Sequence, residues 1–229
     1  PRLKLLKPII LKFKLHVLLL ILLLSSFSKE PPSNAWKLAK EIEGVKIYTR
    51  EMPSSAVKEL MIKSVIKGNS LASFVALFQD VPEYENWVYS CEKALLLQKY
   101  SETEIAYYIK SSFPWPLNAR DFVIKNKIWQ NKKTLAFHSK SEALNDHLPQ
   151  INGVVRITTF SAEWIITPAK NGDFVLQYTF SSDPGGNLPA WLVNSFIDYG
   201  PLKTIKAMES EAKKPKYAKA KFPYIKELP

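Results

Sequence analysis

The stretch Pro-Trp-Pro-Leu-Asn-Ala-Arg-Asp-Phe-Val, residues 114–123, joins a rigid turn to the start of a strand. Each proline lacks a backbone donor and restricts φ, so the first three residues predict a fixed turn. Strand character continues to residue 129. Because neighbours in a strand point to opposite faces, we expect one of Arg120 and Asp121 to face the interior. The residue that faces the interior either belongs to a structural ion pair or anchors the turn, or it contacts the head group of a ligand.

Strand-like segments recur on both sides of this stretch, with short polar breaks between them. Such breaks are typical of hairpins and predict an antiparallel meander. The segment 153–167 is long enough that it must bend or twist strongly to stay in one sheet. The expected segments are 92–100, 103–112, 120–129, 133–141, 153–167 and 173–182.

The chain before residue 80 predicts two helices and two strands. Ser33 or Asn34 can cap a short helix that runs through Glu43. Strands are expected at 45–48 and 56–67, the second because its apolar side chains alternate. After the N-cap residue Ser70, apolar side chains fall on one helical face. That face consists of Leu71, Phe74, Val75 and Phe78.

After residue 186 the apolar period changes from two to 3.6. Leu192, Phe196 and Tyr199 form one helical stripe, and further apolar residues extend it to Met208. Pro201 should kink or divide this helix. The order of elements predicts an α+β fold in which a curved antiparallel sheet wraps around a long C-terminal helix. A gap between them would be an apolar ligand cavity.

Arg156 is the second charge of interest. In a continuous strand over 153–167 it shares a face with Phe160, Trp164 and other apolar residues. An arginine on the apolar face is more informative than one that faces water, since a buried charge requires a partner. We therefore expect Arg156 to face the cavity.

Basic residues concentrate at the two ends of the chain. The net charge is +11, of which residues 1–28 carry +5 and residues 211–229 carry +4. A basic groove in the central part is therefore not expected, and we predict no nucleic-acid partner. Residues 213–229 are expected to form a basic flexible tail, which either contacts anionic lipid heads or is simply solvated.

The N-terminus has the layout of a targeting segment. Basic residues precede the apolar run 16–24, and small residues follow at Ser26 and Ser28. This order predicts a secretory signal peptide over residues 1–28, with an uncleaved membrane anchor as the alternative. The protein is then expected to be periplasmic or secreted.

Side chains typical of catalytic sites are few. Three histidines show no metal-ligand spacing, Cys91 stands alone, and no Gly-rich phosphate loop or nucleophile motif occurs. Asp146-His147 is the one adjacent acid-base pair, and such a pair is more often a solvated turn. We expect no metal, no cofactor and no catalytic residue.

Several motifs resemble the START domains, the lipid-transfer modules related to the steroidogenic acute regulatory protein. They are residues 114–123, Val155-Arg156, Trp164 with Pro168, and Asp183–Asn194, preceded by Trp36, Gly44–Arg50, Asp80 and Trp87. The resemblance runs from about residue 34 to 212, so residues 29–212 are identified as a START-like domain. It implies a helix-grip fold and an internal tunnel, gated by Leu144–Asn152 and Leu188–Tyr199, that binds one lipid-like molecule without chemistry.

The resemblance leaves the partner of Arg120 open. Family members often carry an acidic residue that faces the cavity charge, and here Glu92 and Lys93 lie nearby in sequence. An enzyme of the cyclase or hydrolase type and an interaction module with a filled cavity are the alternative functions. We expect a monomer. The expected ligand-binding residues are Trp87, Tyr107, Arg120, Asp121, Arg156, Phe160, Trp164, Leu188, Trp191, Leu192, Phe196 and Tyr199.

Overall fold

The computed structural model describes residues 34–53, 55–113, 115–145, 147–186 and 188–228. The expected targeting segment therefore lies outside the described residues. The described part is built around one sheet of ten strands in the order β1-β2-β3-β10-β9-β7-β6-β5-β4, with β8 beside β6. All pairs are antiparallel except β6 with β8.

The strands follow the expected alternation of side chains. They are β1 (Lys37–Ile42), β2 (Val45–Met52), β3 (Ser55–Ile66), β4 (Cys91–Ser101), β5 (Glu104–Ser111), β6 (Arg120–Gln130), β7 (Phe137–Ala143), β8 (Val155–Ile157), β9 (Phe160–Pro168) and β10 (Phe174–Ser182).

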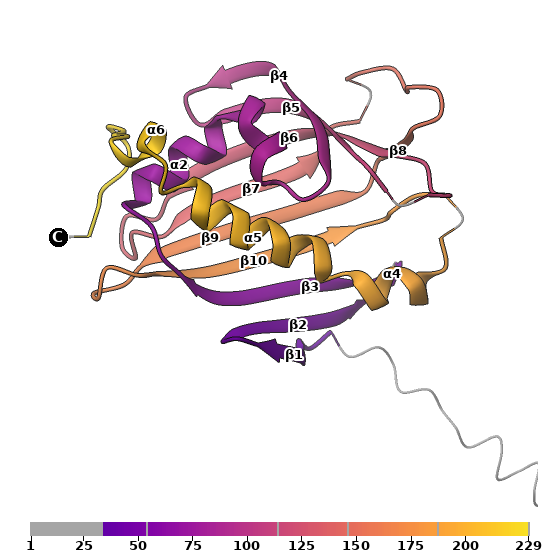
Figure 1. Ribbon diagram of the computed structural model, residues 1–229, viewed down its shortest axis with the longest axis horizontal. Helices are drawn as coiled ribbons and strands as arrows, with labels where there is room; N and C mark the ends of the chain where they lie inside the picture. The colour runs from indigo at the N-terminus through magenta and orange to yellow at the C-terminus, as the bar shows by residue number, and fades with distance from the viewer. Residues whose placement is uncertain (1–33, 54, 114, 146, 187, 229) are drawn as a thin grey trace, which may run out of the picture. The chain divides into compact units, whose positions relative to one another are not determined.

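The helices lie on one face of this curved sheet, with α5 running across it (Figure 1). They are α2 (Leu71–Gln79), the 3-10 turn η1 (Val81–Glu83), α3 (Tyr84–Trp87), α4 (Ala190–Phe196), α5 (Tyr199–Glu211) and α6 (Pro215–Ala218). The helix-grip architecture expected from the sequence is confirmed. Ser70 caps α2 as predicted, because its hydroxyl accepts the backbone N–H of Ser73 at 3.0 Å.

The prediction of a short helix that runs through Glu43 is wrong, since this segment forms the edge strand β1. Glu43 and Gly44 both adopt positive φ, at 50° and 79°. Such a two-residue turn joins hairpin strands, and a glycine at its second position is its usual signal. The Glu-Gly turn between these two strands therefore outweighs the local helix propensity of the segment.

The long strand expected over 153–167 is divided into two. Val155–Ile157 pairs in parallel with the start of β6, whereas Phe160–Pro168 pairs with β7 and β10. The break at residues 158–159 changes which face each later residue occupies, because side chains alternate with a period of two. The expected strand over 133–141 begins only at Phe137, since residues 131–135 form a turn in which Asn131 Oδ1 accepts two backbone N–H groups.

The C-terminal helix is divided as expected, but before the proline rather than at it. α4 ends at Phe196 and α5 begins at Tyr199, which places Pro201 in the first turn of α5. The first turn of a helix tolerates proline because its N–H groups lack partners within the helix. Ile205 and Met208 of α5 are buried against the sheet.

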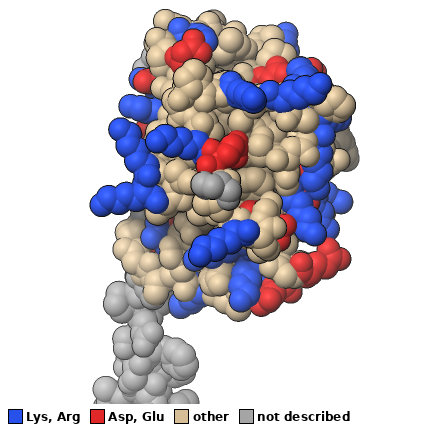
Figure 2. Space-filling view, turned by 90° about the vertical axis from the view of Figure 1, so that its left-hand side faces the viewer, with Lys and Arg blue, Asp and Glu red and all other residues tan. Residues whose placement is uncertain are grey.

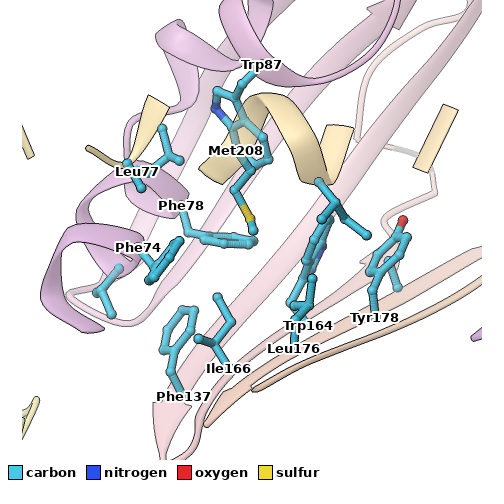
Figure 3. Packing of buried hydrophobic residues seen from close by; sticks show 14 of the residues in the cluster. Phe74, Leu77, Phe78, Trp87, Phe137, Trp164, Ile166, Leu176, Tyr178 and Met208 are labelled. Atoms are coloured by element: carbon cyan, nitrogen blue, oxygen red, sulfur yellow. The ribbon is translucent and has the colours of Figure 1, made fainter. Parts of the chain in front are cut away.

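One half of the space between sheet and helices is filled with side chains. Phe74 and Phe78 of α2 pack with Phe137, Ile166 and Met208 (Figure 3), and Phe78 meets Phe137 edge-to-face at 5.6 Å between ring centres. Edge-to-face geometry is favoured between aromatic rings. This packed half fixes α2 and α5 on the sheet, and the other half is hollow.

The prediction of a flexible tail over residues 213–229 is wrong for the described residues 213–228, which pack against the domain. Tyr217 is buried in the core cluster, and its hydroxyl donates to Asp80 Oδ2 at 3.0 Å. The carboxylate of Glu227 accepts the first two backbone N–H groups of α2, at 2.9 and 2.8 Å. A carboxylate at a helix N-terminus is favoured by the unpaired N–H groups there. Contacts of Tyr217 and Glu227 with distant parts of the chain therefore hold this segment against the domain.

Lysines and arginines are dispersed over the face drawn in Figure 2. Acidic and uncharged side chains separate them, so this face carries no continuous basic surface. Lys216, for example, pairs with Asp80 at 2.6 Å and with Glu83 at 2.9 Å. This distribution agrees with the prediction that nucleic acid is not a partner, which stays a prediction.

Candidate functional site

A cavity of about 710 Å³ lies between the sheet and the helices α3, α4 and α5. Most of the lining is aliphatic or aromatic; among the described residues it also includes hydroxyl groups and one charged side chain, Arg120. The volume falls in the range of small-molecule sites, about 300–1,000 Å³. The hollow half of the molecule is therefore the candidate functional site.

Most of the residues expected at the site line this cavity. Strands β5, β6 and β9 and the helices around them bring them together from distant parts of the chain. They are Trp87, Tyr107, Arg120, Phe160, Trp164, Leu188, Leu192, Phe196 and Tyr199.

Asp121 and Arg156 do not line the cavity, and the expectation for them is corrected. They lie opposite each other in the β6–β8 ladder and form a bidentate ion pair, with Arg156 Nε at 2.8 Å and Nη2 at 3.0 Å from the two carboxylate oxygens. Arg156 also donates to the carbonyls of Leu148 and Pro149. The pair therefore fastens the segment before β8 to the outer side of β6.

Arg120 lies on the cavity side of β6 and is only 3% exposed. Nη1 donates to the carbonyl of Asn118 at 2.6 Å, and the guanidinium lies 4.4 Å from the centre of the Phe113 ring. Among the described residues Arg120 has no carboxylate partner; Glu92, the acidic residue near it in sequence, pairs instead with Lys110 at 2.8 Å. Burial lowers the pKa of the Arg120 guanidinium.

A neutral polar cluster on the cavity side of β5, β6 and β7 was missed by the sequence reasoning. Asn126 Nδ2 donates to Ser139 Oγ at 2.8 Å and to Ser141 Oγ at 2.9 Å, and Tyr107 Oη lies 3.4 Å from Ser141 Oγ. The two serines and Tyr107 line the cavity. The available signal was strand parity, because Asn126 shares the face of Arg120, Phe122 and Ile124.

Further aromatic residues of the lining were also missed. Phe78 and Tyr84 come from α2 and α3, and Phe122, Tyr178 and Phe180 come from strands. Burial raises the pKa of Tyr107 to about 12 and raises the pKa values of Tyr84 and Tyr178 as well. These tyrosines are therefore protonated at neutral pH and present neutral hydroxyl groups.

Exposed aromatic side chains lie in, or next in sequence to, segments that line the cavity. Phe196 and Tyr199 belong to the lining yet are 65% and 51% exposed, which marks where the cavity reaches the surface. Trp191 of α4 is 69% exposed and does not line the cavity, contrary to expectation. Trp115, in the turn before β6, is 92% exposed. We call these four residues the aromatic rim.

The groups examined for catalysis lie elsewhere. His138 is on the outer face of β7, where its Nδ1 lies 3.2 Å from Glu163 Oε1 and its ring stacks on Trp129. Asp146, of the Asp146-His147 pair, is outside the described residues. Within the described ranges no three metal-binding side chains lie together, and no helix there is long and apolar enough to span a bilayer.

Comparison with protein families and sequences gives a consistent result. A family model described as the START domain matches residues 30–216. An uncharacterized protein of Pseudomonas aeruginosa is 33% identical over 180 residues, which cover 78% of this chain and 87% of that protein. The phosphatidylcholine transfer protein of Mus musculus is 25% identical over 163 residues, which cover 69% of this chain and 75% of that protein.

Comparison with solved structures supports the fold. The crystal structure of a STAR-related lipid transfer protein from Xanthomonas axonopodis matches with a TM-score of 0.71 and 29% identity, over 77% of this chain and 98% of that chain. The human StAR-related lipid transfer protein 5 matches with a TM-score of 0.67 and 17% identity, over 88% of this chain and 95% of that chain.

Proposed function

Because this chain belongs to the START domain family, we propose that it binds one lipid-like molecule in its internal cavity and carries it without chemical change. The observation that carries the proposal is a largely apolar cavity of about 710 Å³ that holds one buried cation, Arg120. The mouse and Xanthomonas proteins described above are named as lipid-transfer proteins, which supports a lipid as the ligand.

Burial of acyl or ring surface would supply most of the binding free energy. Removal of apolar surface from water contributes about 25 cal/mol per Å². The lining offers both aliphatic side chains, such as Ile109 and Ile124, and flat aromatic faces, such as Trp164 and Phe160. This surface is suited to a hydrophobic ligand of any regular shape, so it supplies affinity more than selectivity.

Arg120 is proposed to contact the polar head group of the ligand. Its hydrogen bonds go to carbonyl oxygens, which are dipoles and not counter-charges. A buried cation without a carboxylate is costly, so an anionic group that enters the cavity would lower the free energy of the loaded form. A phosphate or a carboxylate meets this requirement, since both bind guanidinium with charge-assisted hydrogen bonds.

An enzyme that acts on a hydrophobic substrate in the same cavity is the alternative function. General acid-base chemistry of the cyclase or hydrolase type needs a group that exchanges protons near neutral pH. The described lining includes no His, Cys, Asp or Glu, and the pKa values of its tyrosines Tyr84, Tyr107 and Tyr178 are raised. These observations favour the carrier.

Transient membrane contact through the aromatic rim is part of the proposal. Tryptophan and tyrosine favour the membrane interface, where one end of the side chain is apolar and the other wet. Trp115 lies in sequence between the lining residues Phe113 and Leu117, and Trp191 directly precedes the lining residue Leu192. The basic residues 213–228 would add attraction to anionic lipids, weakened by salt.

We also propose that the protein acts as a monomer in the periplasm or outside the cell.

Native mass spectrometry of residues 29–229, purified without detergent, tests the carrier function. We expect a one-to-one adduct whose mass, after organic extraction, identifies a lipid class. A bare protein that also fails to take up phospholipid, sterol and fatty-acid probes would contradict the proposal. Turnover of a cavity-bound substrate would favour the enzyme instead.

Sedimentation with phosphatidylcholine vesicles tests the membrane contact. We expect the variant Trp115→Ala/Trp191→Ala to bind vesicles more weakly than the wild type, because two exposed indole rings are lost from the rim. Trp129→Ala is the matched control, since Trp129 is exposed on the outer face of β6 and stacks on His138. Equal loss in both variants would show that the rim has no special role.

A further inference from the structure

The neutral polar cluster of Asn126, Ser139, Ser141 and Tyr107 is unusual because it lies inside an otherwise apolar part of the cavity. Each of the four residues is at most 5% exposed. The neighbouring lining residues Phe78, Trp87 and Trp164 are aromatic. Polar groups in such surroundings are normally all hydrogen-bonded, because an unpaired one loses its hydration without compensation.

The hydrogen bonds within the cluster leave some hydroxyl protons without an acceptor. The amide of Asn126 uses its two N–H groups on Ser139 Oγ, Ser141 Oγ and the carbonyl of Lys140. Of the hydroxyl pair Tyr107 and Ser141, only one can donate to the other. The Ser139 hydroxyl accepts from Asn126 and, among the described residues, donates to none. The cluster therefore presents O–H donors without acceptors.

The cluster lies well separated from Arg120 on the same side of the same strand. Arg120 and Asn126 are six positions apart in β6, and even spacing puts both side chains on the cavity face. At about 3.3 Å per residue this corresponds to roughly 20 Å along the strand. Phe122 and Ile124, which lie between them on that face, are apolar. The cavity thus offers a cationic site, an apolar stretch and a neutral donor site in one line.

We propose that the ligand is an amphiphile with two polar ends: an anionic group at Arg120 and an uncharged oxygen acceptor, a hydroxyl or a carbonyl, bound by Ser139, Ser141 and Tyr107. This inference rests on the proposed function, because it requires a ligand in the cavity. It narrows the ligand class from any lipid-like molecule to one that carries an oxygen far from its anionic head. An unsubstituted acyl chain would leave the free O–H donors unpaired in an apolar surrounding.

Two long-chain acids that differ in one hydroxyl group test this inference. The probes are stearic acid and its derivative with a hydroxyl on the terminal carbon, in competition for the wild-type protein by native mass spectrometry. We expect the hydroxylated acid to bind roughly three- to tenfold more tightly, as one added buried hydrogen bond provides. The eight-carbon acid with a terminal hydroxyl should show no such advantage over its parent acid, because it is too short to reach both sites.

Variants assign the preference to the cluster. In Ser139→Ala/Ser141→Ala the preference for the hydroxylated acid should shrink, since two of the three proposed donors are removed and only the Tyr107 hydroxyl remains. Ser161→Ala is the matched control, because Ser161 is exposed in the adjacent strand β9, and it should keep the full preference. The readout is a ratio within one protein preparation, so a change in the stability of the variant does not affect it.

The outcomes separate this inference from the carrier function. Equal binding of the two stearic acids to the wild type, or an unchanged preference in the double variant, would overturn the second polar site and leave the carrier intact. In that case the cluster serves only to join β6 to β7. Failure of both acids and of the phospholipid and sterol probes to bind would overturn the carrier, and the inference with it.

Discussion

The two sides of β6 treat neighbouring charges in opposite ways. On the outer side, Asp121 has a bidentate partner in Arg156, and both side chains are buried, at 1% and 8% exposure. On the cavity side, Arg120 is also buried but has only carbonyl and aromatic neighbours among the described residues. Two adjacent residues of the same motif therefore differ in whether the protein itself supplies the counter-charge.

This difference separates a structural charge from a candidate binding charge. A paired buried charge stabilises a specific arrangement, here the segment that Arg156 fastens through Leu148 and Pro149. An unpaired buried charge costs free energy unless a counter-charge from another molecule pairs with it. Arg120, the unpaired charge, lines the cavity, where a ligand could supply the missing counter-charge. The predictions below test this difference between the two sides of β6.

The largest effect is expected for Asp121→Asn. It leaves Arg156 buried without a carboxylate, and loss of one partner of a buried pair costs about 3–5 kcal/mol. Urea denaturation measures the free energy of unfolding. The control is Glu104→Gln, which breaks the solvent-screened Lys125–Glu104 pair of 2.7 Å on the same face and should cost much less than Asp121→Asn. Similar costs in the two variants would contradict a structural role for Asp121.

Arg120→Gln is expected to act on ligand binding rather than on folding. A hydrogen bond to a charged group contributes about 1.5–3 kcal/mol, so the affinity for an anionic lipid should fall about tenfold or more. The unfolding free energy of the empty protein should not fall, because an unpaired buried cation is removed. Competition in native mass spectrometry gives the affinity. Lys127→Gln, on the outer face of β6, should leave it unchanged; equal losses would mean that the cavity charge is not special.

Removal of both members of the outer pair is expected to cost less than removal of one. In Asp121→Leu/Arg156→Met no uncompensated charge remains, and such replacements are often close to neutral, so we expect a cost below about 2 kcal/mol. A double-mutant cycle in urea gives the coupling energy. A double variant that is less stable than Asp121→Asn would show that the contacts of Arg156 with Leu148 and Pro149 matter more than its ion pair.

The smallest effect is a loss of stability in alkali from Tyr107 and Tyr108, which lie on opposite faces of β5. Burial raises the pKa of each to about 12, and Asp121 contributes to the shift of Tyr108. Unfolded tyrosine titrates near 10, so between pH 10 and 12 the folded state binds more protons and stability falls as pH rises. At pH 10 each should cost a few tenths of a kcal/mol.

Tyrosinate absorbance can then separate the two sides. Asp121→Asn should lower the pKa of Tyr108, because a negative charge near its hydroxyl is removed, and leave Tyr107 unchanged. A shift that appears in both tyrosines, or in neither, would contradict the assignment of Tyr108 to the side of Asp121.

Local patterns were sufficient for most of the fold and for much of the cavity. Alternation predicted the strands around Arg120, and the 3.6-residue period predicted the helices that hold Phe74 and Met208. Ser70 was identified as an N-cap because its chemistry is local. The prediction at residues 213–228 failed where a contact distant in sequence decided the outcome, such as Glu227 with the start of α2. The prediction at β1 failed because the local Glu43-Gly44 turn was overlooked.

The site was predicted less completely than the fold, because a single break in a strand reverses the faces. Phe160 and Trp164 were placed correctly in the cavity, but the break at residues 158–159 gives Arg156 the opposite side. The cluster around Asn126 was overlooked since serines and an asparagine in a strand are ordinary as sequence. Only their shared position on the wall of a largely apolar cavity makes them informative.

The sequence by itself determined the class of fold, the order of most of its elements and the expectation of an apolar cavity, because side-chain periodicity and turn chemistry act over a few residues. It also determined that Arg120 and Asp121 would lie on opposite faces. Only the tertiary structure decided which of them is paired, since the partner Arg156 lies 35 residues away. Pairing depends on strand register, and a shift of one residue exchanges inside and outside.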